Sequence, residues 1–413
     1  MSQSHTGPAE GPGSLATAVE TYAAGLAPEV VDVVRRAAQR VPALAERLGS
    51  AGLDAANLTA HDVSRLPILT KDDVLARQKE RPPFGDLLAA DADVRRVFQS
   101  PGPLYEPQLG GADPWRWAPA LEAIGLEAGE TVLNCFGYHL SPAGAMFEEG
   151  CLALGATVLP GGIGNQDLQV QAIADLGVTA YVGLPSYLKT LVERYDAAGL
   201  PADRWRLTKA LVTAEPLPDS LRALLQERVP TVLSSYGTAE VGLIAYETAP
   251  GSGLLPAPGV HVEVCDLATG EPIAAGEGQV VVTLMRPDYP VVRFGTGDLS
   301  AWMQDGDGRP RLVGILGRVG EAVKVRGMFL HPRQAEAVMR DLEGVADWGF
   351  VIDRVNHRDE LRCEIVATGH DPAAVAGRVR DAIRAGLRFG ADVRTVDVLP
   401  EGHATITDNR AWD

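Results

Sequence analysis

The apolar residues of this 413-residue chain recur at helical spacing in some segments and at strand spacing in others. Residues 28–48, "PEVVDVVRRAAQRVPALAERL", carry apolar side chains every three or four positions, which predicts a helix. "RLPILTKDDVLARQ" predicts a turn and then a helix with Thr70 as N-cap, because Asp72 and Asp73 suit the positive end of a helix. From residue 116 to about residue 235, apolar runs such as "ETVLNCFGY" and "VTAYVGLP" alternate with helical stretches. That alternation predicts βαβ units and a mostly parallel sheet with helices on its faces.

At about residue 259 the pattern changes to an antiparallel one. "GVHVEVCDLATGEPI" alternates apolar and polar residues and turns at "ATGE", which predicts a hairpin, and strand and helix patterns follow up to the C-terminus. The expected fold class is α/β: a large N-terminal domain with mostly parallel sheets plus a β-rich subdomain, followed by a small mobile α+β C-terminal domain. The expected boundaries are a disordered tail at 1–16, the large domain at 17–316 with its β-rich subdomain at about 257–316, a hinge at 317–321 and the small domain at 322–413.

Charge and composition restrict the partners. The formal net charge of −17 argues against nucleic acid, because phosphate backbones are held by basic surfaces, and it weakens a membrane-surface interpretation. The four cysteines lack metal-ligand spacing, no run of about 18 apolar residues occurs, and the N-terminus lacks the features of a signal peptide. We therefore expect a cytoplasmic protein that handles a small molecule or another protein.

Several short motifs in one order carry a resemblance to a known family. They are "LPILTKDD", "NCFGYHLSPAG", "LPSY", "TAEP", "SSYGTAEVG", "VVRFGTGDLS" and "GILGRVGEAVKVRGMFLHP". In order and spacing they resemble the adenylate-forming superfamily of acyl-CoA synthetases, peptide-synthetase adenylation domains and luciferases. The phenylacetate–CoA ligase-like branch matches best, from about residue 30 to residue 413. The resemblance implies a cleft for nucleotide, acyl group and coenzyme A, and it makes a homodimer an expectation.

The segment "YGTAE" follows an apolar strand, so its side chains belong at the carboxyl edge of a parallel sheet, where α/β folds bind ligands. Tyr236 offers a ring face, and Gly237 lies beside it. Thr238 offers a hydroxyl to a phosphate, and Glu240 offers a carboxylate to Mg²⁺ if ATP is used. The alternative is a strand end with a surface glutamate.

"RFGTGDL" and "GRVGEAVKVRG" add the remaining nucleotide-side candidates. Asp298 can accept both hydroxyls of a ribose, although a β-turn aspartate after two glycines is also common. The resemblance assigns Arg318 to ribose or phosphate and places the hinge at Gly320. The family usually has Asp or Lys at that hinge, whereas glycine absorbs large backbone rotations.

Two departures from the family pattern affect ATP chemistry. Where the family reads like Ser-Ser-Gly-Thr-Thr-Gly-Lys-Pro, this chain reads "FQSPGPLYEP". Pro101 and Pro103 each remove an N–H donor from a loop that wraps phosphates, and Glu106 adds negative charge. The family's C-terminal catalytic lysine is also missing, since no lysine follows Lys324 and His403 stands near the expected place.

Both losses remove adenylation, which favours an enzyme that transfers an aryl or other acyl group from an acyl-CoA. The acceptor would be a thiol, such as the phosphopantetheine of an acyl carrier protein, or an amine. Coenzyme A or acyl-CoA is then the cofactor. Two alternatives remain: an ATP- and Mg-dependent aryl/acyl-CoA ligase with an atypical phosphate loop, and a non-catalytic ligand-binding protein.

Two histidines are candidate catalytic bases because imidazole is neutral near pH 7 and can deprotonate a thiol or amine. His139 follows a predicted buried strand and should face the acyl pocket; the alternative is a histidine packed at the strand end. His403 would arrive on the mobile domain in place of lysine; the alternative is a loop histidine. The acyl pocket is expected to contain aromatic and small residues at strand ends and turns: Phe136, Tyr138, Gly183, Pro185, Tyr187, Ala214 and Glu215.

Overall fold

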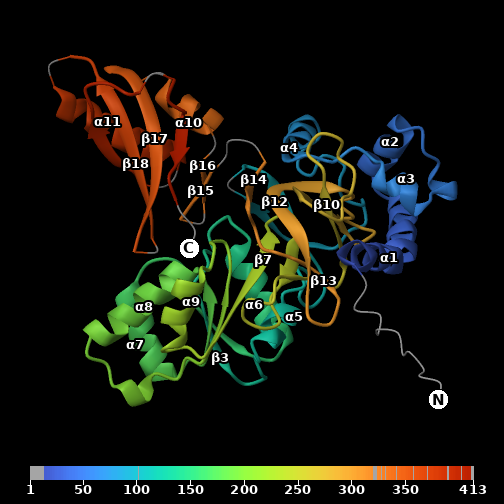
Figure 1. Ribbon diagram of the computed structural model, residues 1–413, viewed down its shortest axis with the longest axis horizontal. Helices are drawn as coiled ribbons and strands as arrows, with labels where there is room; N and C mark the ends of the chain where they lie inside the picture. Colours follow the sequence, from blue (N-terminus) through green and yellow to red (C-terminus); the bar gives the residue numbers. More distant parts are fainter. Residues whose placement is uncertain are drawn as a thin grey trace, which may run out of the picture.

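The computed structural model describes residues 14–410 except positions 101, 320–322, 327, 331, 341, 357, 370, 388–389 and 401. A large N-terminal domain with a mostly parallel sheet and a second β-sheet is followed by a smaller α+β domain, which confirms the predicted fold class (Figure 1). The expected tail and hinge fall partly outside the described residues. Residues 1–13 of the tail, and Gly320 and Glu321 of the hinge, lie outside the described residues.

The N-terminal region is helical: α1 (Leu15–Ala38), α2 (Pro42–Ser50), the short η1 (Ala55–Asn57), α3 (Ala60–Ser64) and α4 (Lys71–Glu80). The single helix predicted over 28–48 is wrong, because α1 ends at Ala38 and Pro42 opens a second helix, where its missing N–H costs nothing. Helix α1 begins at Leu15 with Ser14 as N-cap, inside the expected tail. Thr70 is confirmed as the N-cap of α4, in a reciprocal capping box with Asp73.

The central sheet has seven strands in the order β4-β3-β5-β6-β7-β8-β9. The first five are mutually parallel, whereas β8 and β9 are antiparallel additions at one edge. The strands are β3 (Thr131–Asn134), β4 (Thr157–Pro160), β5 (Ala180–Gly183), β6 (Lys209–Val212), β7 (Thr231–Thr238), β8 (Gly242–Tyr246) and β9 (Leu255–Pro256). The helices between or before them are α5 (Ala118–Ala123), α6 (Ala143–Ala153), α7 (Gln166–Leu176), α8 (Pro185–Ala197), the short η2 (Ala202–Arg204) and α9 (Asp219–Gln226). The parallel strands are short apolar runs because helices cover both faces.

A second, antiparallel sheet is formed by β10 (Val260–Cys265), β11 (Glu277–Leu284), β12 (Phe294–Gln304), β13 (Pro310–Leu312) and β14 (Gly317–Arg318). The predicted hairpin turn lies after β10, but the return strand is β11, and Pro272 makes only an isolated bridge to Cys265.

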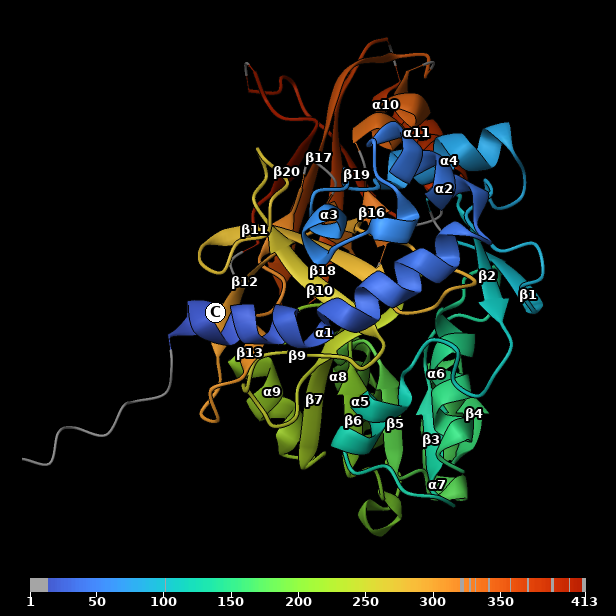
Figure 2. The same ribbon diagram turned by 90° about the vertical axis from the view of Figure 1, so that its right-hand side faces the viewer.

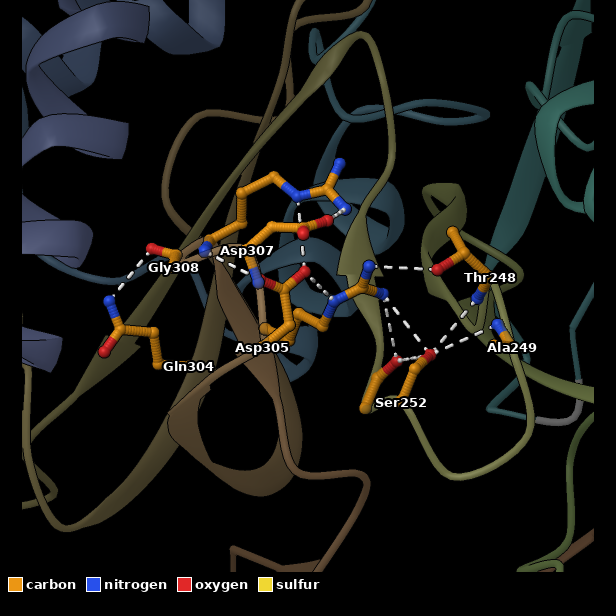
Figure 3. A network of polar contacts seen from close by, with 10 residues as sticks. Thr248, Ala249, Ser252, Gln304, Asp305, Asp307 and Gly308 are labelled. Atoms are coloured by element: carbon orange, nitrogen blue, oxygen red, sulfur yellow. Dashed lines mark hydrogen bonds and ion pairs between the residues drawn. The ribbon is translucent and has the colours of Figure 1, made fainter. Parts of the chain in front are cut away.

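An arginine that is almost fully buried ties this sheet to the loop after β8. Arg311, on β13, bonds to Asp305 Oδ2 through Nε at 2.8 Å and to Thr248 Oγ1 through Nη2 at 2.9 Å (Figure 3). Its Nη1 reaches Ser252 Oγ and the Gly253 carbonyl at 3.5 and 3.4 Å. We call these five residues the Arg311 network. Burial works to raise the pKa of Asp305, but the bond from Arg311 and backbone N–H donors outweigh it and lower that pKa to about 2.

The small domain contains β15 (Val323–Val325), β16 (Met328–Leu330), α10 (Pro332–Met339), β17 (Val345–Val355), β18 (Arg358–Ala367), α11 (Pro372–Leu387), β19 (Asp392–Thr395) and β20 (Ile406–Asp408). Its main sheet has the order β19-β18-β17-β20. The long β17–β18 hairpin points toward α8 of the large domain (Figure 1). There Arg358 bonds to Thr190 Oγ1 at 2.9 Å and to Glu193 Oε2 at 2.8 Å. Among the described residues, no helix combines the length and apolar character needed for a membrane span.

Candidate functional site

The segment "FQSPGPLYEP", which the resemblance places at the family's phosphate loop, belongs to a β-hairpin. Strands β1 (Val94–Gln99) and β2 (Tyr105–Leu109) pair in antiparallel fashion, and the Ser100 N–H donates to the Leu104 carbonyl at 2.9 Å (Figure 2). The Gln78 side chain, from α4, accepts from the Tyr105 N–H and donates to its carbonyl, both at 2.8 Å. The N–H groups of Ser100 and Tyr105 are therefore used within the protein. Pro101 lies outside the described residues.

Strand β2 directs a carboxyl group inward. Glu106 is 2% exposed and accepts a long hydrogen bond of 3.5 Å from Ser100 Oγ. Burial raises the pKa of Glu106 well above its usual value, nearby Glu240 raises it further, and Lys71 opposes both. Burial likewise raises the pKa of Tyr289, with smaller contributions from Glu106 and Glu240. Glu106 therefore lies close enough to the carboxylate of Glu240 for the charge of Glu240 to act on it.

A lysine that the sequence did not single out as a site residue neutralises that second carboxylate. Lys71, the first residue of α4, places its Nζ 2.7 Å from Glu240 Oε1, and their side chains are 35% and 6% exposed. Burial works to raise the pKa of Glu240, but Lys71, with smaller contributions from the Glu240 backbone and the nearby Thr238 side chain, outweighs burial and lowers it. Glu240 Oε2 and Thr238 Oγ1 are buried and have no hydrogen-bond partner within the described part of the chain. We call Lys71, Glu106, Thr238 and Glu240 the cleft cluster.

The cleft cluster fits a magnesium–triphosphate group poorly. Mg²⁺ prefers one or two carboxylates, several waters and phosphate oxygens in octahedral geometry. Here Glu240 is already paired with an ammonium, and the buried Glu106 adds a second acidic group, whose pKa Glu240 raises. Within the described ranges, no three His, Cys, Asp or Glu side chains are grouped so as to hold a metal ion. The two unpartnered oxygens are the features that favour an added ligand.

Three of the residues predicted for the nucleotide side, Tyr236, Asp298 and Arg318, come together. Tyr236 Oη donates to Asp298 Oδ2 at 2.8 Å, and Arg318 Nε lies 3.0 Å from Asp298 Oδ1. Burial raises the pKa of Tyr236 well above its usual value, and Asp298 raises it further. Gly237 is required here, because a Cβ would lie 2.5 Å from the Gly242 carbonyl and 2.8 Å from the ring of Trp117.

The predicted acyl-pocket residues divide into packed and accessible groups. Phe136 belongs to a packed stack, since its ring lies 4.8 Å from that of Phe147, which in turn lies 4.0 Å from Trp117. Tyr138 Oη accepts from Asn134 Nδ2 at 2.8 Å, and Tyr187 Oη donates to Gln169 Oε1 at 2.7 Å. Tyr138 and Tyr187 are only partly buried. These two rings line the carboxyl ends of β3 and β5.

The turns that follow β5 and β6 of the same sheet lie near the small domain. Pro185 opens α8 two residues after Gly183, and a Cβ on Gly183 would collide with the Tyr181 hydroxyl. Ala214 has φ of 71°, and the following Glu215 accepts from the Ser186 N–H at 3.4 Å. Burial raises the pKa of Glu215, Ser186 lowers it, and the field of Asp359 from the small domain raises it. The small domain therefore lies against the predicted substrate side.

The two candidate histidines lie in different surroundings. His139 is exposed, and the next residue, Leu140, adopts φ of 59°. His403 Nδ1 and Nε2 lie 3.1 and 3.0 Å from the carbonyls of Pro400 and Trp348, within the small domain. Their catalytic roles remain predictions.

The chain is similar to AMP-binding enzymes and to coenzyme A ligases. A family model described as "AMP-binding enzyme" matches residues 117–283. The phenylacetate-coenzyme A ligase of Thermus thermophilus is 29% identical over 353 residues, covering 79% of this chain and 77% of the relative. A 2-hydroxyisobutyryl-CoA ligase, in complex with 2-HIB-AMP and CoA in its thioesterification state, aligns with a TM-score of 0.82 and 23% identity over 95% of this chain and 90% of that one. An open conformation of the same ligase, also with 2-HIB-AMP and CoA, reaches a TM-score of 0.67 at 21% identity over 94% and 91%.

Proposed function

The chain belongs to the adenylate-forming superfamily as a phenylacetate–CoA ligase-like enzyme, and we propose that it transfers a preformed acyl group without ATP. The donor is an acyl-CoA thioester, with an aryl acyl group as the first class to test. The acceptor is a thiol such as a carrier-protein phosphopantetheine, or an amine. In the transfer the acceptor attacks the thioester carbonyl and loses a proton, the C–S bond breaks, and coenzyme A leaves as the thiol.

The observation that carries this proposal is the closed β1–β2 hairpin. The Ser100 N–H donates to the Leu104 carbonyl, and the Tyr105 N–H donates to the Gln78 side chain. The buried carboxyl group of Glu106 lies near that of Glu240. Phosphoryl transfer depends on positioning and neutralising the phosphates, so this change opposes the adenylation half-reaction most directly. The second half-reaction of a ligase, in which an acyl group moves to a thiol, needs none of those contacts.

The placement of the small domain gives independent support. The fit to one ligase fold is closer in its thioesterification state than in its open conformation, with TM-scores of 0.82 and 0.67. In this protein Arg358 bonds across the domain boundary to α8. A cleft arranged for thiol attack is what acyl transfer between thiols requires.

The ATP-dependent ligase remains the second candidate, because Thr238 Oγ1 and Glu240 Oε2 are buried without a partner and Asp298 keeps a ribose-compatible place. Relatives such as the Thermus thermophilus protein are named as ligases. A non-catalytic binding role would leave the same pocket without turnover.

One paired assay separates these three functions. The protein is incubated with a panel of aryl-CoA thioesters and pantetheine or a phosphopantetheine-bearing carrier, without nucleotide, and acyl transfer is followed by mass spectrometry. In parallel it receives the free acids, Mg-ATP and coenzyme A, and pyrophosphate release is measured. Transfer without pyrophosphate release supports the proposal, whereas acid-dependent pyrophosphate release identifies a ligase. Binding without either product identifies the non-catalytic protein.

A further inference from the structure

Three segments that are distant in sequence supply the charges of the cleft cluster. Lys71 comes from the first turn of α4, Glu106 from β2 and Glu240 from the turn between β7 and β8. Glu106 and Glu240 are almost fully buried, and within the described residues Lys71 is the cation that pairs with Glu240. The cluster therefore contains two carboxyl groups and one fixed ammonium.

Lys71 is a cation in the first turn of its helix, where acidic residues are favoured. A cation in the first turn faces the positive end of the helix dipole, which costs about 0.3–1 kcal/mol. Asp72 and Asp73 are the residues that suit this turn, and Asp73 completes the capping box with Thr70. A residue that opposes its own helix needs a gain elsewhere, and the 2.7 Å bond to the buried Glu240 supplies it.

An ammonium at this place also competes with a metal ion for the same carboxylate. A magnesium ion would bind a carboxylate oxygen at about 2.0–2.1 Å and bring its own waters. Lys71 Nζ already lies 2.7 Å from Glu240 Oε1, and the Lys71 side chain remains 35% exposed. An anionic group in solvent can therefore reach the Lys71 side chain.

We infer that the Lys71 ammonium is the built-in cation of this cleft and takes the place of a divalent metal ion beside Glu240. Lys71 is thereby a candidate ligand-binding residue for anionic groups on the nucleotide side of the cleft. This inference rests on the proposed function in that it assigns a cation to the same cleft. Its test measures metal binding and does not depend on turnover.

The test uses Mn²⁺ as the probe, with electron paramagnetic resonance of the free ion and isothermal titration on the full chain. Wild-type protein should show no specific site tighter than about 1 mM. Lys71→Ala removes the ammonium and leaves the Glu240 carboxylate beside Glu106, so it should gain one Mn²⁺ site at least about tenfold tighter. Lys79→Ala is the matched control, because Lys79 lies exposed on the same helix, and it should behave as wild type.

Two further variants distinguish Mn²⁺ binding at the cleft cluster from Mn²⁺ binding to carboxylates on the acidic surface of the protein. Lys71→Ala/Glu240→Gln should lose the Mn²⁺ site again, whereas binding to surface carboxylates would persist. Lys71→Gln removes the charge but keeps a polar side chain only one atom shorter, and it replaces Lys71→Ala if that variant does not fold. A tight Mn²⁺ site in wild type that Glu240→Gln abolishes would overturn the inference, as would Lys71 variants that stay metal-free. Neither result would decide whether the protein transfers acyl groups, which the thioester assay measures separately.

Discussion

Two buried polar clusters of this protein, the Arg311 network and the cleft cluster, differ in how many of their polar atoms have a hydrogen-bond partner. In the Arg311 network each guanidinium nitrogen has a partner, and Asp305 accepts from both side chains and backbone. In the cleft cluster two oxygens lack partners within the described residues, and a carboxyl group with raised pKa lies beside the Lys71–Glu240 pair. Buried polar groups in proteins are nearly always hydrogen-bonded. The comparison therefore marks the cleft cluster as the place where a ligand completes the contacts, and the Arg311 network as structural.

The largest expected effect comes from breaking the structural cluster. Arg311→Met leaves Asp305 without its buried cation and should cost about 3 kcal/mol of unfolding free energy, measured by urea denaturation at pH 7. Asp305 has a lowered pKa, so its contribution is present above its ordinary pKa and is lost as the pH falls toward about 2. The difference between wild type and Arg311→Met should therefore shrink below about pH 4. A difference that is constant from pH 7 to pH 3 would contradict this assignment.

The cleft cluster should show the opposite pH dependence. Glu106 has a raised pKa, so its protonated form is the stable one, and that stability is lost as the pH rises through its folded pKa. Glu106→Gln keeps the shape and stays neutral. Its melting temperature should be higher than that of wild type by on the order of 2 °C at pH 8.5, and close to that of wild type at pH 5. Thermal denaturation followed by circular dichroism measures both. A variant less stable than wild type at pH 8.5 would show that the ionised carboxylate is the form that the fold holds.

The smallest effect on stability is expected at the domain boundary. Arg358→Ala removes exposed contacts to Thr190 and Glu193, and exposed ion pairs contribute about 0–1 kcal/mol. Unfolding free energy should change little, whereas distances between spin labels on α8 and β18 should broaden in pulsed electron resonance. Arg394→Ala serves as control, because its ion pair with Asp392 lies inside the small domain. An unchanged distance distribution in Arg358→Ala would mean that other contacts hold the domains together.

The sequence predicts the strands and helix ends around the site better than it predicts which charged side chains pair there. Strand ends, the Thr70 cap and the meeting of Tyr236, Asp298 and Arg318 follow from local patterns and from the rule that parallel strands end at one edge. The break at Pro42 was also readable from the residue itself.

The pairing of Lys71 with Glu240 could not be predicted from local patterns. The two residues are far apart in sequence, and "LTKDD" reads as a helix start whichever way the lysine points. The one available signal was the conflict between a lysine and the positive end of its own helix. The exposure of His139 could not be predicted either, because the strand pattern before it gives no signal for the left-handed backbone at Leu140.

Isothermal titration with Mg-ATP, and then with aryl-CoA thioesters, tests most directly whether this cleft has exchanged triphosphate chemistry for acyl transfer. The account predicts no heat of binding from Mg-ATP at about 1 mM and binding of at least one thioester with a dissociation constant on the order of 10 μM. Micromolar binding of Mg-ATP, lost in Glu240→Gln and followed by acid-dependent pyrophosphate release, would contradict it and identify a working ligase.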